Sequence, residues 1–118
     1  MEERRQLPRF EIKKDSKAWL PPTQVFSHCV IEDLHLKGMS VSFEKELPPI
    51  DPLKMSFTIG ENFDFIKVEA QVRWEKDDQD RYVYGLSFSK ILDEDKDKID
   101  QYIQTNCFDQ VKEKWWGK

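Results

Sequence analysis

The chain has 118 residues, of which 38% are hydrophobic and 36% are charged, and its formal net charge is −4. This length and apolar content predict one compact domain and exclude global disorder. The negative charge argues against DNA or RNA partners, because binding a phosphate backbone normally requires a positive field. No apolar run approaches the ~20 residues of a transmembrane helix, and the N-terminus lacks an apolar signal segment. We therefore expect a soluble, cytoplasmic protein without a transmembrane segment.

The N-terminal stretch is basic, although the chain as a whole is acidic. Residues 1–17 carry six basic and four acidic groups, which gives a local charge of +2. Pro8 fixes its own φ and disfavours helical backbone just before it, so Arg5 and Arg9 are expected on an extended arm. Arginine bonds phosphate bidentately and stacks on bases, so these two residues and Arg4 are candidate contacts to an anionic ligand. Taken alone, the stretch is more simply interpreted as a solvated basic arm.

Apolar and polar residues alternate with period two through most of the chain. Residues 53–59 alternate throughout, and residues 68–75 alternate strictly, which predicts half-buried antiparallel strands with Val72 and Trp74 on the apolar side. The alternation slips once at 65–66, which favours a bulge or a strand start there. Strands are expected over residues 10–19, 23–33, 39–44, 53–59, 65–75 and 82–91, with turns at 60–62 and 76–80. Their number and spacing favour a closed barrel or a sandwich, because closure removes exposed edges.

The last quarter of the chain has helical periodicity. Apolar residues recur there at three- and four-residue steps, as on one buried face of a helix. They are Ile99, Tyr102, Ile103, Cys107, Val111 and Trp115. Asp93 is a suitable N-cap, and the acidic run over residues 93–100 is interpreted as a solvated helix start. The helix is expected to cover the barrel, in one piece or with a break at 105–106. Packing of this helix is the interpretation for Trp115 and Trp116, with a partner or membrane-interface anchor as the alternative.

A second candidate binding stretch lies between two predicted strands, at residues 32–43. Asp33 can accept hydrogen bonds from a base, and His35 can donate or accept near neutral pH. Gly38 permits a positive φ or a close approach of backbone. By itself, the stretch is also typical of a loop with an Asx-type turn.

Metal binding and catalysis are disfavoured by the spacing of the reactive side chains. Cys29, Asp33 and His35 could share one face of a strand, and His28 lies near them, but a metal site needs three or four converging ligands. Nucleophilic catalysis by Cys29 or Cys107 would need an oriented base and a third group. We therefore expect neither a metal site nor an enzyme, and two buried thiols rather than a disulfide.

Taken together, the arm and the second stretch resemble the PilZ domain family. Residues 5–9 (RQLPR) match the family pattern R-x-x-x-R, and residues 33–38 (DLHLKG) match D/N-x-S-x-x-G except at the serine. Residues 68–74 (VEAQVRW) and 84–91 (YGLSFSKI) resemble later strands of the family, and an acidic-capped helix follows them. The resemblance covers most of the chain and implies a six-stranded antiparallel β-barrel with a C-terminal α-helix.

The resemblance also implies a function and a role for each matching residue. The protein would be a bacterial receptor for cyclic di-GMP, without a further cofactor, that signals ligand state to a protein partner in control of motility, exopolysaccharide export or transcription. Arg5 and Arg9, with the neighbouring Arg4, would grip phosphates and guanines, often of an intercalated ligand dimer. Asp33 would hold a guanine edge, and Gly38 would let the backbone pass close to the ligand.

The same resemblance suggests how the chain is divided. Residues 1–104 would form the barrel domain, including a ligand arm at residues 1–12 that wraps the bound ligand and the start of the C-terminal helix. Residues 105–118 would form a helical extension.

One position departs from the family pattern, because His35 occupies the place of the serine. Imidazole is larger than a hydroxyl, but it can donate from a ring nitrogen and stack, so His35 is retained among the ligand-binding candidates. The alternative function is a ligand-independent interaction module whose active face is the helix stripe with Trp115 and Trp116.

Overall fold

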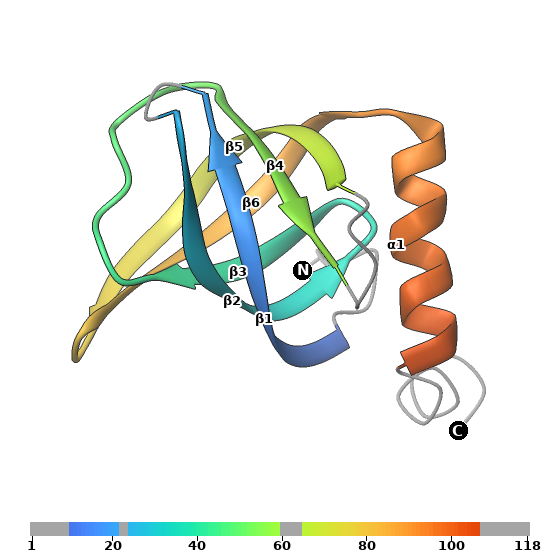
Figure 1. The fold of residues 1–118 in the computed structure, drawn as a ribbon, viewed down its shortest axis with the longest axis horizontal. Coiled ribbons are helices and arrows are strands. Elements are labelled where there is room, and N and C mark those ends of the chain that lie inside the picture. The colour runs from blue at the N-terminus through green and yellow to red at the C-terminus, as the bar shows by residue number, and fades with distance from the viewer. Residues whose placement is uncertain (1–9, 22–23, 60–64, 107–118) are drawn as a thin grey trace, which may run out of the picture.

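The computed structural model describes residues 10–21, 24–59 and 65–106. Within these ranges it contains β1 (Phe10–Leu20), β2 (Val25–His35), β3 (Gly38–Phe43), β4 (Leu53–Thr58), β5 (Phe65–Asp78), β6 (Arg81–Ile91) and α1 (Asp93–Asn106). Neighbouring strands pair antiparallel in the order β1-β2-β3-β6-β5-β4, and β4 returns to β1 to close a barrel (Figure 1). The predicted six-stranded barrel with a C-terminal helix is confirmed. Candidates outside the described residues are Arg4, Arg5, Arg9, Cys107, Val111, Trp115 and Trp116.

The barrel interior is filled by alternate residues of each strand, as period two requires. In β4 the side chains of Leu53, Met55 and Phe57 are at most 2% exposed, which confirms the face predicted for this strand. Cys29 is fully buried among the same core residues. The core therefore follows the sequence pattern directly wherever the ladder is regular.

Three strands extend further than their sequence pattern predicted. β2 runs to His35, because His35 pairs directly with Gly38 and leaves only residues 36–37 as the connection. β5 and β6 continue through the polar run to the pair of Asp78 and Arg81, and Gln79, with φ of 60°, makes the turn. Polar residues do not end these strands, because this ribbon of two strands projects beyond the barrel and exposes most of its side chains.

Val72 and Trp74 do not share a half-buried face, contrary to the prediction for residues 68–75. Their exposed fractions are 41% and 38%. The pairing of β4 with β5 ends at Leu53 and Ala70, so the side of β5 that carries Val72 is no longer covered by β4. The register with β6 then shifts between Val72 and Trp74, which inserts Arg73 as an extra residue and reverses the alternation. Trp74 consequently lies on the outer surface of the barrel.

The helix α1 adds its apolar stripe to the same core. Ile99 and Ile103 are 0% and 1% exposed and belong to the barrel cluster, while Tyr102 packs at its margin. Figure 1 shows α1 standing beside the barrel after β6. No helix among the described residues has the length and apolar character needed to cross a membrane.

Asp95 corrects the interpretation of the acidic run as a solvated helix start. Its side chain is buried, and its Oδ2 accepts a hydrogen bond from the backbone N–H of Lys67 at 3.3 Å. Lys98, one helical turn later, places Nζ 3.3 Å from Asp95 Oδ1. The carboxylate therefore attaches the first turn of α1 to β5, while Asp93, Glu94 and Asp97 remain exposed.

Candidate ligand-binding face

The tight hairpin between β2 and β3 brings together Asp33, His35 and Gly38, the candidate site residues that lie within the described part of the chain. Asp33 lies opposite Ser40, and Asp33 Oδ1 accepts a hydrogen bond from the Ser40 backbone N–H at 3.2 Å. His35 lies opposite Gly38, and His35 Nδ1 accepts one from the Lys37 backbone N–H at 3.4 Å. Both side chains are partly exposed, so their polar atoms are held in position while remaining accessible.

Gly38 is required for a close approach of two strands, not for a left-handed turn. Its φ lies outside the left-handed region, which decides between the two roles predicted for it. A Cβ at this position would overlap the backbone carbonyl oxygen of Leu86 and would lie 3.1 Å from His35 Nε2. The N–H of Phe88 also donates to the carbonyl of Lys37 at 2.8 Å. The hairpin is therefore pressed against β6.

A continuous row of residues crosses four strands on the outer surface. Asp33 pairs with Ser40, Ser40 with Gly85, and Gly85 with Trp74, so all four side-chain positions face the same way. Ser40 is 5% exposed, and the Trp74 indole lies directly on Gly85, where a Cβ would overlap its Nε1 and Cε2 atoms. The row forms a floor of small residues between a carboxylate and an aromatic ring.

A neighbouring row adds a guanidinium group to this surface. This row crosses the same four strands through directly paired residues, from His35 to Gly38, then Ser87, then Gln71. Arg73 Nε donates to Ser87 Oγ at 3.2 Å, which holds this exposed arginine on the strand that pairs with Gly38. We call the outer surface formed by Asp33, His35, Gly38, Ser40, Arg73, Trp74, Gly85 and Ser87 the ligand face.

Arg81 lies at the border of the ligand face, where its guanidinium group is hydrogen-bonded to Ser42 of β3. Its Nε donates to Ser42 Oγ at 2.8 Å and its Nη2 to the Ser42 carbonyl at 2.9 Å. Ser42 Oγ in turn donates to Glu32 Oε2 at 3.3 Å. This network covers Ser42, which is 1% exposed although it points away from the core.

The first described residue of the chain enters the barrel beside the hairpin. Phe10 pairs with Leu34 and Glu11 with Asp33, so the residue that directly follows Arg9 is fixed next to Asp33. Residues 10–12, which were assigned to the predicted arm, already belong to β1. The register therefore brings the entry of the arm to one border of the ligand face, while Arg4, Arg5 and Arg9 themselves are outside the described residues.

The sequence interpretation missed Arg73, Trp74 and Ser87 as members of this face. The alternation predicts Trp74 on the apolar side of β5, and the bulge at Arg73 has no signature in it. The glycine inside β6 was the available signal, because a glycine within a strand often marks a close approach or a large neighbour.

The residues weighed as metal ligands do not converge. Cys29 lies in the barrel core, whereas His28 faces outward with Nε2 3.3 Å from Asp15 Oδ1. Among the described residues, no group of three His, Cys, Asp or Glu side chains is placed to hold a metal ion. Burial raises the pKa of the Cys29 thiol from 9.0 to about 11, so the thiol stays protonated and unreactive near neutral pH.

Comparison with known proteins places this geometry in context. The family model of the PilZ domain matches residues 3–105. The fold is similar to the inhibitor of motility MotI/DgrA from Bacillus subtilis, with a TM-score of 0.68 and 19% identity over 92% of this chain and 53% of that one. It is also similar to YcgR from Escherichia coli solved with c-di-GMP, with a TM-score of 0.68 and 12% identity over 94% and 49% of the two chains.

The separately solved PilZ domain of Escherichia coli YcgR, also with c-di-GMP, matches over 95% of this chain and 97% of its own, with a TM-score of 0.66 and 15% identity. The chain thus spans about half the length of MotI/DgrA and of whole YcgR, and nearly all of the separate domain. The search of curated proteins gave no significant match. These TM-scores establish the shared fold.

Proposed function

Because the chain belongs to the PilZ domain family, we propose that it is a receptor for cyclic di-GMP and that it relays the ligand state to a protein partner. Both YcgR structures described above contain c-di-GMP. The observation that carries the proposal is the row from Asp33 through Ser40 and Gly85 to Trp74. A carboxylate at one end and an aromatic ring at the other, with small residues between them, suit a flat base with hydrogen-bond donors on its edge.

Each end of this row can recognise a different property of guanine. The Asp33 carboxylate accepts hydrogen bonds, and guanine N1–H and N2–H are adjacent donors. One oxygen of Asp33 is oriented by the Ser40 N–H, which reduces the entropy lost on binding. The Trp74 ring offers a partly exposed π-face for stacking, an interaction typically worth about 1–3 kcal/mol per base. Arg73 adds a positive charge next to this ring.

The arm supplies the charge that neutralises the phosphates in this proposal. Arg5 and Arg9, with Arg4, would contact the phosphates and guanines after the arm folds over the ligand face from its entry at Phe10. Their guanidinium groups suit this role because they bond phosphate oxygens bidentately. If the conformation of the arm depends on the ligand, the surface presented to a partner protein changes on binding. This change would transmit the ligand state to the partner.

Isothermal titration calorimetry of the full chain with cyclic di-GMP tests the proposal. We expect saturable binding by the native protein and at least tenfold weaker binding by Arg9→Ala and by Asp33→Asn. Lys54→Ala is the matched control, because Lys54 is exposed on β4, which does not contribute to the ligand face. Absence of binding by folded native protein would refute the receptor function, and unchanged binding by Arg9→Ala would refute the role of the arm.

The alternative function is an interaction module that does not depend on ligand, and His35 is the observation that favours it. Its imidazole lies close to Gly38, in space that a serine hydroxyl would leave open. The variant His35→Ser separates the two functions. Under the receptor proposal it changes affinity moderately, because the Nδ1 atom is engaged by Lys37 N–H and the ring is held in one orientation. Binding that appears only in His35→Ser would instead show that this chain is adapted away from the ligand.

A further inference from the structure

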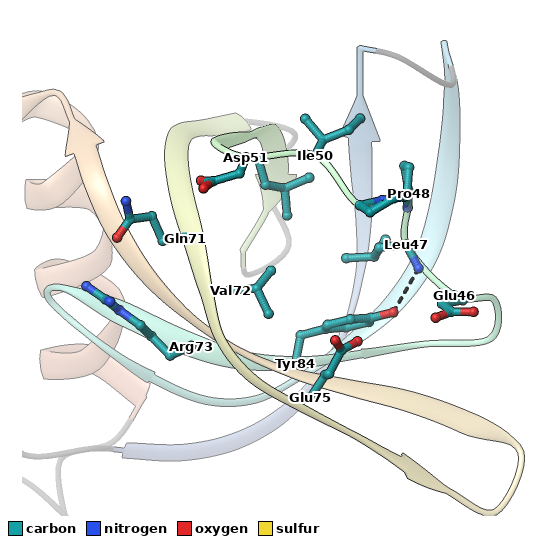
Figure 2. A pocket seen from close by; sticks show the side chains of 12 residues that line it. Glu46, Leu47, Pro48, Ile50, Asp51, Gln71, Val72, Arg73, Glu75 and Tyr84 are labelled. Carbon is teal, nitrogen blue, oxygen red and sulfur yellow. Dashed lines mark hydrogen bonds between the residues drawn. The ribbon is translucent and has the colours of Figure 1, made fainter.

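A cleft opens at the end of the barrel opposite the β2–β3 hairpin. It has a volume of about 720 Å³ and lies between the segment that connects β3 to β4 and the parts of β5 and β6 around Val72 and Tyr84. Figure 2 shows Leu47 and Ile50 on one wall, with Val72 and Tyr84 facing them from the strands. We call this space the loop cleft. Its volume is within the range of pockets that bind ligands or peptide side chains.

The apolar part of the loop cleft is preformed. The Tyr84 hydroxyl accepts a hydrogen bond from the Leu47 backbone N–H at 2.8 Å, which fixes the connecting segment over the barrel end. Val72 is 41% exposed and faces into the cleft, while Leu53 is buried beneath it. An apolar side chain entering here would cover Val72 without first having to reorganise the segment.

The rim of the loop cleft is acidic. Glu46, Asp51 and Glu75 are exposed on it, and Arg73 is the one basic residue among the described residues that line it. In Figure 2 the Arg73 side chain extends away from Glu46 and Glu75, toward its bond with Ser87. Burial raises the pKa of the Tyr84 hydroxyl, and the negative charges of Glu75 and Glu46 raise it further. Both carboxylates therefore project negative potential onto the cleft.

The wall of the loop cleft is also a wall of the ligand face. Val72 and Glu75 line the cleft, while Trp74 between them lies on Gly85 of the ligand face. Arg73, the bulged residue, lines the cleft and bonds Ser87, which pairs with Gly38. A ligand that shifts the backbone at Trp74 or Arg73 would also shift Val72 and Glu75, because these cleft residues are their direct chain neighbours.

We propose that the loop cleft binds a basic segment of a partner protein, with one apolar side chain against Val72 and Tyr84 and flanking lysines or arginines against Glu46, Asp51 and Glu75. Charge complementarity selects this occupant, because three carboxylates surround an apolar floor. The coupling of this site to the ligand face, through residues 72–75, rests on the proposed function. The docking of a basic segment does not.

Fluorescence anisotropy with the full chain tests the docking. The probe is a fluorescein-labelled ten-residue peptide of two central leucines flanked by lysines and arginines, and its counterpart carries glutamates instead. We expect saturable binding of the basic peptide, about tenfold weaker binding by the double variant Glu46→Gln/Glu75→Gln, and weaker binding at high salt. The matched control is Glu94→Gln/Asp97→Asn, which removes the same charge from the exposed start of α1.

Three results would overturn the docking proposal. The first is equal binding of the acidic peptide, and the second is unchanged binding by the Glu46/Glu75 double variant. The third is a native dimer, measured by light scattering, that dissociates in this variant, because the occupant would then be a second copy of the chain. Circular dichroism confirms that each variant is folded, which we expect because both glutamates are exposed.

Coupling is measured by repeating the titration with saturating cyclic di-GMP. We expect the Kd of the basic peptide to change at least threefold, and the Kd of the nucleotide to change by the same factor when the peptide is saturating, since linkage is reciprocal. Binding of both without mutual effect would overturn the relay. Peptide binding in a protein that takes no nucleotide would refute the receptor function but leave the docking site in place.

Discussion

Alkaline pH should destabilise the barrel through one buried thiol. Cys29 is fully buried, and burial raises the pKa of its thiol from 9.0 to about 11, against the opposing effects of a hydrogen bond with Ser16 and the charge of Arg81. Between these two values the unfolded chain releases a proton that the folded chain retains. The stabilisation is therefore complete below pH 9 and is lost as the pH rises toward 11. At about 1.4 kcal/mol per pH unit, this difference corresponds to roughly 3 kcal/mol.

Urea denaturation followed by circular dichroism, at pH values below, between and above the two pKa values, measures this loss. Cys29→Ala is the reference, because groups that titrate in both proteins cancel when the two pH profiles are compared. The free energy of unfolding of Cys29→Ala should be lower than that of the native protein near neutral pH, but it should fall less steeply than the native value above pH 9. Part of the decline will remain at higher pH, because burial also raises the pKa of Tyr84. Equal slopes for the native protein and Cys29→Ala would refute the reasoning.

Three further changes test the packing that builds the site, each by urea denaturation. Gly38→Ala places a Cβ on the backbone carbonyl of Leu86, which cannot rotate away, so we expect a loss of about 1–3 kcal/mol. Gly85→Ala instead meets the Trp74 side chain, so adding Trp74→Ala should recover much of its loss in a double-mutant cycle. Asp95→Ala leaves a strand N–H without its acceptor and should cost about 1–3 kcal/mol; no loss would contradict that contact.

The regular part of the barrel could be predicted because period two is a local property of the sequence. In β4 every second residue from Leu53 is apolar, and each of these side chains is buried. The proximity of Asp33, His35 and Gly38 in the proposed ligand face was equally predictable, since they lie within six residues and pair with each other or their neighbours. Short sequence separation made both features visible in the sequence.

The remaining features depend on contacts between distant segments. Asp95 was interpreted as one more solvated acid of a helix start, because its partner is a backbone N–H of β5, a group that every residue except proline carries. Trp74 was assigned to the wrong face because the register shift at Arg73 arises from pairing with β6. Neither residue type nor spacing within one segment reveals such pairing.

The same bulge explains how one strand can serve two surfaces. Without the extra residue at Arg73, strict alternation would place Val72 and Trp74 on the same side of β5, and the ligand face would lack its aromatic ring. With the bulge, Val72 remains in the loop cleft while Trp74 turns outward onto Gly85. Bulged strands bend and twist more than regular ones. A base stacked on Trp74 would therefore contact the part of β5 that also positions Val72 and Glu75, which is the connection that the proposed coupling requires.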